Sequence, residues 1–178
     1  MADTLLGFEA ARLKADKAAR GQRRVVPLPV VDPPSVPDAE LRAHINRLAD
    51  GRVWIWLPVE PVGAVRQTQA DRWKARPAVL RYRDWRDRIR ILLAQVDIPA
   101  HGGQWLFLFQ APRSWSKRRK ADTLFAGHTQ KPDADNCLKA VLDVAFTEDA
   151  HIWDARVTKR WWRHPGIVLI LPGAGEHP

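Results

Sequence analysis

The chain has 178 residues, of which 46% are hydrophobic, so it can bury a sizeable core without a disulfide or a structural metal ion. It carries 29 Lys and Arg residues against 20 Asp and Glu residues, and the net charge of +9 fits a polyanionic partner such as nucleic acid or an acidic membrane surface. The single cysteine, Cys137, excludes an intramolecular disulfide and a cysteine-rich zinc cluster, and it is consistent with a reducing compartment. The apolar runs are too short to span a bilayer, and the first residues lack the apolar segment of a secretory signal. We therefore expect a cytoplasmic protein.

The first fifty residues differ in character from the rest. Amphipathic spacing predicts two short helices, over residues 4–20 and 38–49, and the prolines between them favour an extended, loop-like path. These fifty residues hold almost as many acidic as basic side chains, so nearly all of the net positive charge lies in the remainder. We treat residues 1–50 as an N-terminal extension and residues 51–178 as the main domain.

The main domain alternates strand and helix patterns. Two helices are predicted, one beginning at Pro77 and running to residue 95, and one over residues 135–146. A basic, polar loop is expected at residues 112–130. In the strand predicted over residues 152–161, apolar residues alternate with polar ones, which puts Trp153 on the buried face. Lys159 is the exception to this alternation. Aromatic and β-branched runs predict four strands, over residues 53–58, 104–110, 152–161 and 167–171. The expected fold is α+β, a single mixed β-sheet with helices packed on it.

Two carboxylates, Asp133 and Asp135, stand where the basic loop enters the helix 135–146. At this spacing on extended backbone they can point the same way, and they then repel each other unless a cation lies between them. Hard oxygen ligands suit Mg²⁺, with Mn²⁺ as a possible substitute. A third carboxylate is needed to complete such a site. Asp149, after the helix, is the best candidate, and its neighbour Glu148 is the alternative.

A helical projection places Asp135, Lys139 and Asp143 on one narrow stripe of the same helix. Most of the remaining circumference is apolar, which is not typical of a solvated surface helix, so the charged flank is expected to line a cleft. Lys139 could hold a phosphate oxygen or stabilise a leaving oxyanion while a bound metal activates water. Structural readings stay open: an aspartate can act as a helix N-cap, and Lys139 can pair with Asp135 or Asp143 at i, i+4.

The basic loop is a candidate DNA-binding segment. Trp115 lies among cations there, and an aromatic ring in such a setting can stack on a base or sugar while the cations hold phosphates. The arginines of the helix 77–95 are interpreted instead as a solvated face. The nucleic-acid-binding candidates are Trp115, Lys117, Arg118, Arg119, Lys120 and Lys131.

These motifs resemble the RusA-type Holliday-junction resolvases of bacteria and their phages. The resemblance rests on Lys131-Pro132-Asp133-x-Asp135-Asn136-x-x-Lys139-x-x-x-Asp143, on Glu148-Asp149-Ala150 followed by a strand ending near Lys159, and on Pro112-x-Ser114-Trp115-Ser116-Lys117. It implies a homodimeric, Mg²⁺-dependent endonuclease, in the cytoplasm of a bacterium or phage-infected host, that resolves four-way DNA junctions by paired symmetric nicks and has no membrane partner. In that family the aspartates matching Asp133, Asp135 and Asp149 bind metal, and the lysine matching Lys139 assists catalysis.

Two other functions compete with a resolvase. A non-catalytic DNA-binding module would keep the basic surface and use the acids only as helix caps, but acidic side chains in the groove would not serve polyanion binding. A metal-dependent nuclease acting on flapped DNA or RNA would need the same residues as a resolvase. Sequence does not separate these last two, because the choice of junction depends on dimer geometry and charge layout.

Overall fold

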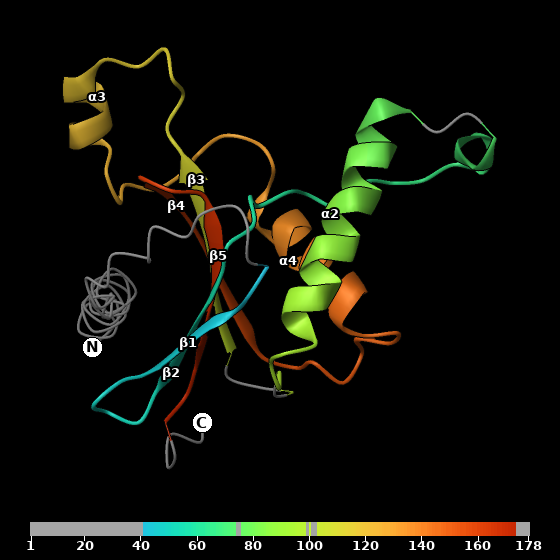
Figure 1. Cartoon of the computed structure of the whole chain (residues 1–178), viewed down its shortest axis with the longest axis horizontal. Helices are drawn as coiled ribbons and strands as arrows, with labels where there is room; N and C mark the ends of the chain where they lie inside the picture. Colours follow the sequence, from blue (N-terminus) through green and yellow to red (C-terminus); the bar gives the residue numbers. More distant parts are fainter. Residues whose placement is uncertain (1–40, 74–75, 99, 101–102, 174–178) are drawn as a thin grey trace, which may run out of the picture. The chain divides into compact units, whose positions relative to one another are not determined.

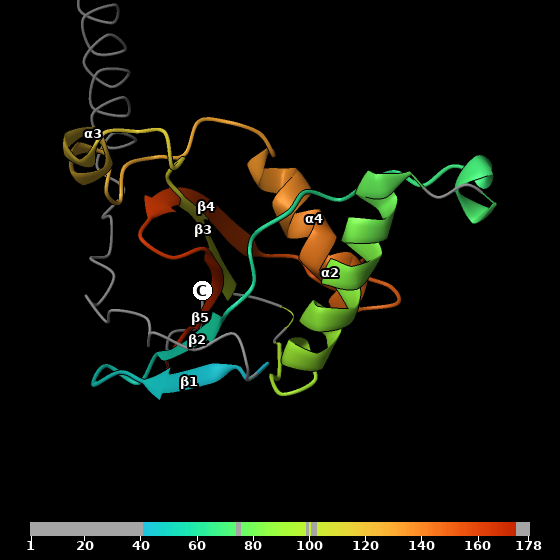
Figure 2. The same ribbon diagram turned by 45° about the horizontal axis from the view of Figure 1, so that its top comes forward.

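The computed structural model describes residues 41–73, 76–98, 100 and 103–173, all within one compact unit. The predicted helix 4–20 lies outside them. One five-stranded sheet runs through this part of the chain in the order β1-β2-β5-β3-β4 (Figures 1 and 2). Its strands are β1 (His44–Arg47), β2 (Val53–Leu57), β3 (Gly103–Gln110), β4 (Ala155–Trp162) and β5 (Gly166–Leu171). The helices are the 3₁₀ helix η1 (Gln69–Arg72), α2 (Pro77–Leu93), α3 (Lys117–Asp122) and α4 (Ala134–Ala145).

The sheet is mixed, as predicted. The β1–β2, β2–β5 and β5–β3 pairs are antiparallel, whereas β3 and β4 pair in parallel, with Gly103 opposite Ala155. A parallel pair needs a crossover, and the chain between β3 and β4 contains α4. This α+β arrangement packs α4 against β4, the edge strand of the parallel pair.

Both α2 and α4 lie against the same side of the sheet (Figures 1 and 2). Alternation along the strands turns one set of side chains toward the helices, and α2 supplies the large residues Trp85 and Ile89 opposite them. Each fully buried large apolar side chain contributes about 1.5–3 kcal/mol. The core contains Ile55, Leu57, Trp105, Phe107, Ile167 and Leu169 of the sheet together with Cys137, Ala140 and Val141 of α4.

The predicted helix 38–49 is wrong, because residues 44–47 form β1. An Asp50-Gly51 turn returns the chain antiparallel to β2, with Gly51 at a φ of 84° and the Leu48 N–H donating to the Arg52 carbonyl oxygen at 2.8 Å. Pairing with the strongly strand-forming β2 outweighs a helical spacing only twelve residues long.

Two further expectations need correction. The basic loop contains the helix α3, which Ser116 caps by accepting a hydrogen bond from the Arg119 N–H at 3.2 Å. The strand predicted from residue 152 begins at Ala155, and Trp153 is 67% exposed rather than buried. Its partner strand β3 starts opposite Ala155, and before that point the Trp153 N–H donates to the Ala100 carbonyl at 3.3 Å. No helix there is long and apolar enough to span a membrane.

Candidate active site

The N-terminal turn of α4 presents two exposed carboxylates. Asp133 is the N-cap by backbone position, with φ −70° and ψ 156°, but its side chain makes no capping hydrogen bond. Asp135 stands in the first turn. Among the described residues neither carboxylate has an ion-pair partner. The capping interpretation therefore holds for the Asp133 backbone and not for its carboxylate, which stays available to a ligand.

This end of α4 is fixed from two sides. The Asn136 amide donates to the Ala64 carbonyl at 3.4 Å, and the Ala64 N–H donates back to the Asn136 carbonyl at 3.1 Å. Gly63 approaches so closely that a Cβ built on it would lie 2.4 Å from the Asn136 Nδ2. Only a residue without a side chain allows this contact. The segment between β2 and α2 thus holds the turn that carries Asp135.

Lys159 supports the loop that leads into α4 from the side of the sheet. It lies on β4 opposite Phe107, and thus on the side of the sheet that the helices cover. Its ammonium donates to the Gln130 carbonyl at 2.7 Å and to the Pro132 carbonyl. This explains why a lysine interrupts the apolar alternation of the strand, because its charge is satisfied by two backbone carbonyls of the loop before Asp133.

Farther along α4, Lys139 and Asp143 form an ion pair, with Nζ 3.0 Å from Oδ1. The hydrogen bond to Asp143 is the main reason that the pKa of Lys139 is raised above its usual value, and the nearby Asp149 raises it further. The i, i+4 pairing of Lys139 is therefore confirmed, with Asp143 as its partner. Lys139 stays protonated at neutral pH, so it can donate to an anion but not act as a base.

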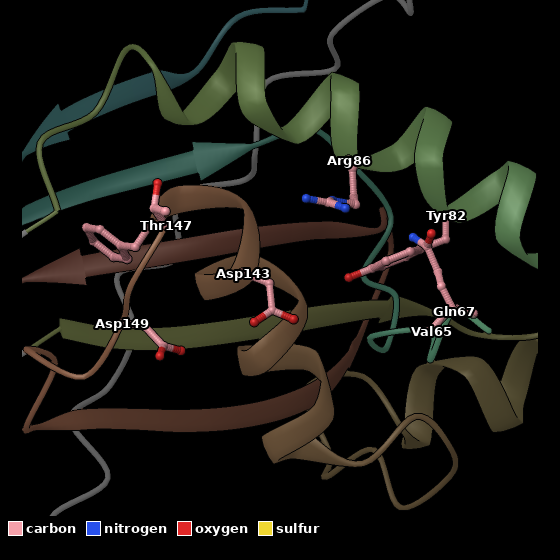
Figure 3. A pocket seen from close by; sticks show the side chains of 8 residues that line it. Val65, Gln67, Tyr82, Arg86, Asp143, Thr147 and Asp149 are labelled. Carbon is pink, nitrogen blue, oxygen red and sulfur yellow. The ribbon is translucent and has the colours of Figure 1, made fainter. Parts of the chain in front are cut away.

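A pocket of about 380 Å³ opens beside this ion pair (Figure 3). The figure shows Tyr82 and Arg86 reaching from α2 toward Asp143, with Asp149 on the loop after α4. The pKa of Tyr82 is raised, first by burial and then by the charge of Asp143. The Arg86 Nε is buried and has no hydrogen-bond partner among the described residues. The pocket is lined by Val65, Gln67, Tyr82, Arg86, Asp143, Phe146, Thr147 and Asp149.

The three predicted metal ligands do not form one group. In the described part of the chain no three His, Cys, Asp or Glu side chains lie close enough together to hold a metal ion. Asp149 lines the pocket with Asp143, whereas Asp133 and Asp135 stand at the other end of α4. Eight residues of helix, about 12 Å, separate Asp135 from Asp143. The carboxylate oxygens of Asp133, Asp135 and Asp149 suit Mg²⁺ chemically, but the described residues do not bring the three together. The three-carboxylate site therefore stays a prediction.

Residues 58–171 match the protein-family model described as endodeoxyribonuclease RusA, which spans α2, α4 and the strands β3 to β5. The chain belongs to the RusA family. The resemblance seen in the sequence is thereby confirmed, and with it an endonuclease of the kind that resolves Holliday junctions and acts on branched DNA. No curated protein and no solved structure matches the chain.

The predicted DNA-binding residues of this RusA-family chain gather on and around α3, apart from Lys131. Trp115 is only partly exposed, because its ring packs on Trp161 at 4.9 Å and the Arg119 guanidinium covers it at 3.9 Å. Stacking of a base on Trp115 would therefore require Arg119 to move. The side chains of Lys117, Arg118 and Arg119 are exposed, as is Lys131 in the loop before α4, and Lys120 is partly exposed.

Sequence reasoning missed the roles of three residues of this region. Tyr82 and Arg86 belong to the helix whose arginines were interpreted as a solvated face, and for Arg86 that interpretation is wrong. The i, i+4 spacing of the two residues was visible, but nothing local showed that this face of α2 meets α4. Lys159 was noticed as an irregularity in the alternation, and that irregularity was the available signal.

Proposed function

We propose that this RusA-family endonuclease is a divalent-metal-dependent homodimer that resolves Holliday junctions by paired symmetric nicks. The observation that carries the proposal is the pair of exposed carboxylates on the first turn of α4, which have no ion-pair partner among the described residues and lie within the matched region, just after the exposed Lys131. A helix that began there only for structural reasons would engage the carboxylate of Asp133 as a cap.

Asp133, Asp135 and Asp149 are the proposed ligands of Mg²⁺, with Mn²⁺ as a substitute. When bound, such an ion would neutralise the negative charge that develops on the phosphate oxygens during hydrolysis. Carboxylates converge only where a cation offsets their repulsion, so we expect the Asp149 loop to join the other two residues in the loaded enzyme. Glu148 is the alternative third ligand, and it is exposed next to Asp149.

Lys139 is the proposed electrostatic partner of the scissile phosphate. Its ammonium is held by Asp143 and influenced by Asp149, so it lies between the pocket and the first turn of α4. Because its pKa is raised, it remains a cation at the pH of the reaction and can donate a hydrogen bond to a nonbridging or leaving oxygen. Asp143 then acts by positioning the lysine.

The exposed cations of α3 and Lys131 are proposed to bind the DNA backbone. Several phosphate contacts give non-specific affinity and steep salt dependence, whereas the choice of a branched substrate depends on geometry. A two-fold axis supplies that geometry, because two equivalent strands of a junction are cut at symmetric positions. Homodimerisation follows from this requirement.

The test is incubation of the full chain with labelled four-way, flapped and linear DNA and with RNA, in Mg²⁺ and in chelator. We expect paired nicks in the four-way junction that need Mg²⁺ and no comparable cleavage of the linear duplex. Junction binding without cleavage in Mg²⁺ or Mn²⁺ would favour the non-catalytic module. Preferential cutting of flapped DNA or RNA would favour the other nuclease class.

The third ligand has its own matched test. Asp149→Asn is expected to weaken Mg²⁺ binding in calorimetry and to lower cleavage at least about tenfold, because the neutral amide oxygen of asparagine attracts a hard cation less strongly than a carboxylate does. Glu148→Gln is the control at the neighbouring position, and it should leave both quantities near those of the unmodified chain. The opposite ranking of the two variants would transfer the ligand role to Glu148.

A further inference from the structure

Residues 66–73 form a basic arm between β2 and α2. Figures 1 and 2 both show η1, which lies within the arm, projecting beyond the N-terminal end of α2 and away from the sheet. Near the end of the arm, Trp73 is 89% exposed, more than any other exposed large hydrophobic side chain in the described residues. Tryptophan is on average highly buried in folded proteins, so an indole as exposed as this one is a candidate contact for a binding partner.

The arm is an ordered structure built around a buried carboxylate. Asp71 is only 2% exposed, and it accepts hydrogen bonds from the Thr68 N–H at 2.8 Å and from the Arg76 Nε at 3.0 Å. The side-chain hydrogen bond from Arg76 is the main reason that the pKa of Asp71 is lowered, with the Thr68 N–H next. Arg83 of α2 donates to the Asp71 carbonyl at 3.4 Å. Trp73 therefore points outward from a fixed turn that is tied to a helix.

The arm starts at the wall of the pocket. Val65 and Gln67 line that pocket together with Arg86, Asp143 and Asp149, and Gln67 also accepts a hydrogen bond from Arg83 at 3.3 Å. The arm that carries the exposed indole thus begins at the wall of the pocket.

The charge of the arm favours DNA over an apolar protein partner. Its one acidic residue, Asp71, is already paired with Arg76. Arg66 is exposed, and the sequence of the arm also contains Arg72. A lone aromatic side chain among cations suits a nucleic acid, since every base has a face for stacking and every phosphate attracts the cations.

We propose that Trp73 stacks on the base pair left open at the branch point of a DNA junction, with the basic arm holding the flanking phosphates. This inference rests on the proposed function, and it assigns recognition of the branched structure to a residue outside the carboxylate site. Linear duplex offers no such open base pair in its interior. Trp73 therefore contributes to junction binding and not to binding of linear DNA.

The test measures dissociation constants of the full chain for a four-way junction and for a linear duplex of the same sequence, both in chelator so that neither is cut. Trp73→Ala is expected to weaken junction binding at least about fivefold, which is the low end of what one base–aromatic stack contributes. The dissociation constant of Trp73→Ala for the linear duplex should stay within about twofold of that of the unmodified chain. Trp73→Phe keeps a stacking ring and should retain most of the junction affinity.

Two controls complete the design. Ile91→Ala removes another exposed hydrophobic side chain, 55% exposed on α2 but outside the arm, and should leave both constants unchanged. 2-Aminopurine placed at the branch point should change fluorescence when the unmodified chain or Trp73→Phe binds, and not when Trp73→Ala binds. The quaternary state of each variant is measured by analytical ultracentrifugation.

Three results would overturn the inference: unchanged junction binding by Trp73→Ala, an equal loss on both DNAs, or a changed quaternary state in this variant. The last would place Trp73 in an interface between copies. If the unmodified chain itself does not bind junctions, the proposed function fails, and the inference fails with it. If the unmodified chain binds and cuts junctions while Trp73→Ala equals it, only the role of the arm is lost.

Discussion

Replacing Gly63 with alanine tests whether the segment before the basic arm positions the catalytic turn of α4. A Cβ at this position would lie 2.4 Å from the Asn136 Nδ2 and 2.9 Å from the Pro132 Cβ. The Asn136 amide can rotate away, but it then loses its hydrogen bond to Ala64, and the proline ring has no such freedom. Overpacking of this kind costs about 1–3 kcal/mol.

Gly127→Ala is the matched control, because nothing lies within 4 Å of a Cβ built there. Both substitutions restrict the unfolded chain equally, by about 0.4–1 kcal/mol, so that contribution cancels when the two variants are compared. We therefore expect Gly63→Ala to be less stable than Gly127→Ala in urea unfolding by about 1–3 kcal/mol.

The second readout is cleavage under conditions in which both variants are fully folded. Displacement of the turn that carries Asp135 by about 1 Å can lower the rate on the order of 100-fold. Junction binding in chelator should change little, because the basic surface is not part of this contact. A Gly63→Ala variant as stable and as active as Gly127→Ala would refute the claim that this close approach fixes the site.

Three further predictions address charge and burial. Replacing Arg118 and Arg119 together with alanine should weaken junction binding and reduce the slope of log K against log salt by up to about 1.8, and an unchanged slope would place the DNA elsewhere. Asp143→Asn removes the carboxylate whose charged hydrogen bond raises the pKa of Lys139, so the loss of cleavage at alkaline pH should begin at lower pH; an unmoved limb would exclude the Lys139 charge as its cause. Burial raises the pKa of the Cys137 thiol to about 11, so iodoacetamide at about pH 8 should alkylate it far more slowly in the folded chain than in urea, and equal rates would contradict its burial.

The sign of the Lys139 effect follows from the ion pair. A lysine whose pKa is raised on folding stabilises the folded chain at every pH below its unfolded pKa, and this contribution disappears as the pH rises through the folded value. The pair is solvent-exposed, with the Lys139 side chain 63% accessible, so its effect on stability is small. The prediction therefore concerns the pH dependence of cleavage rather than the stability of the fold.

The elements with strong local patterns could be predicted from the sequence. Apolar residues at helical spacing gave α2 and α4 to within two residues at every end, because the predicted ranges 77–95 and 135–146 compare with Pro77–Leu93 and Ala134–Ala145. The motif around Asp133 was placed correctly at the entry to α4 because proline and aspartate mark helix starts. The family followed from the same residues.

The remaining features depend on contacts between distant segments. The segment 44–47 is a strand because β2 lies next to it, and the strand predicted from residue 152 begins only at Ala155, where its pairing with β3 begins. The pocket joins α2 to α4 and the loop after it, so the roles of Tyr82 and Arg86 could not be read from either segment alone. The same holds for Asp149, whose distance from Asp133 depends on how a loop returns along a helix.

The central claim is that acidic side chains on the first turn of α4 make this RusA-family protein a metal-dependent nuclease. Single-turnover cleavage of a four-way junction by Asp135→Asn in Mg²⁺, with binding measured in parallel, tests it most directly. Loss of a ligand and of a negative charge near the phosphates predicts no detectable cleavage together with equal or tighter binding. Cleavage by this variant at the rate of the unmodified chain would contradict the claim.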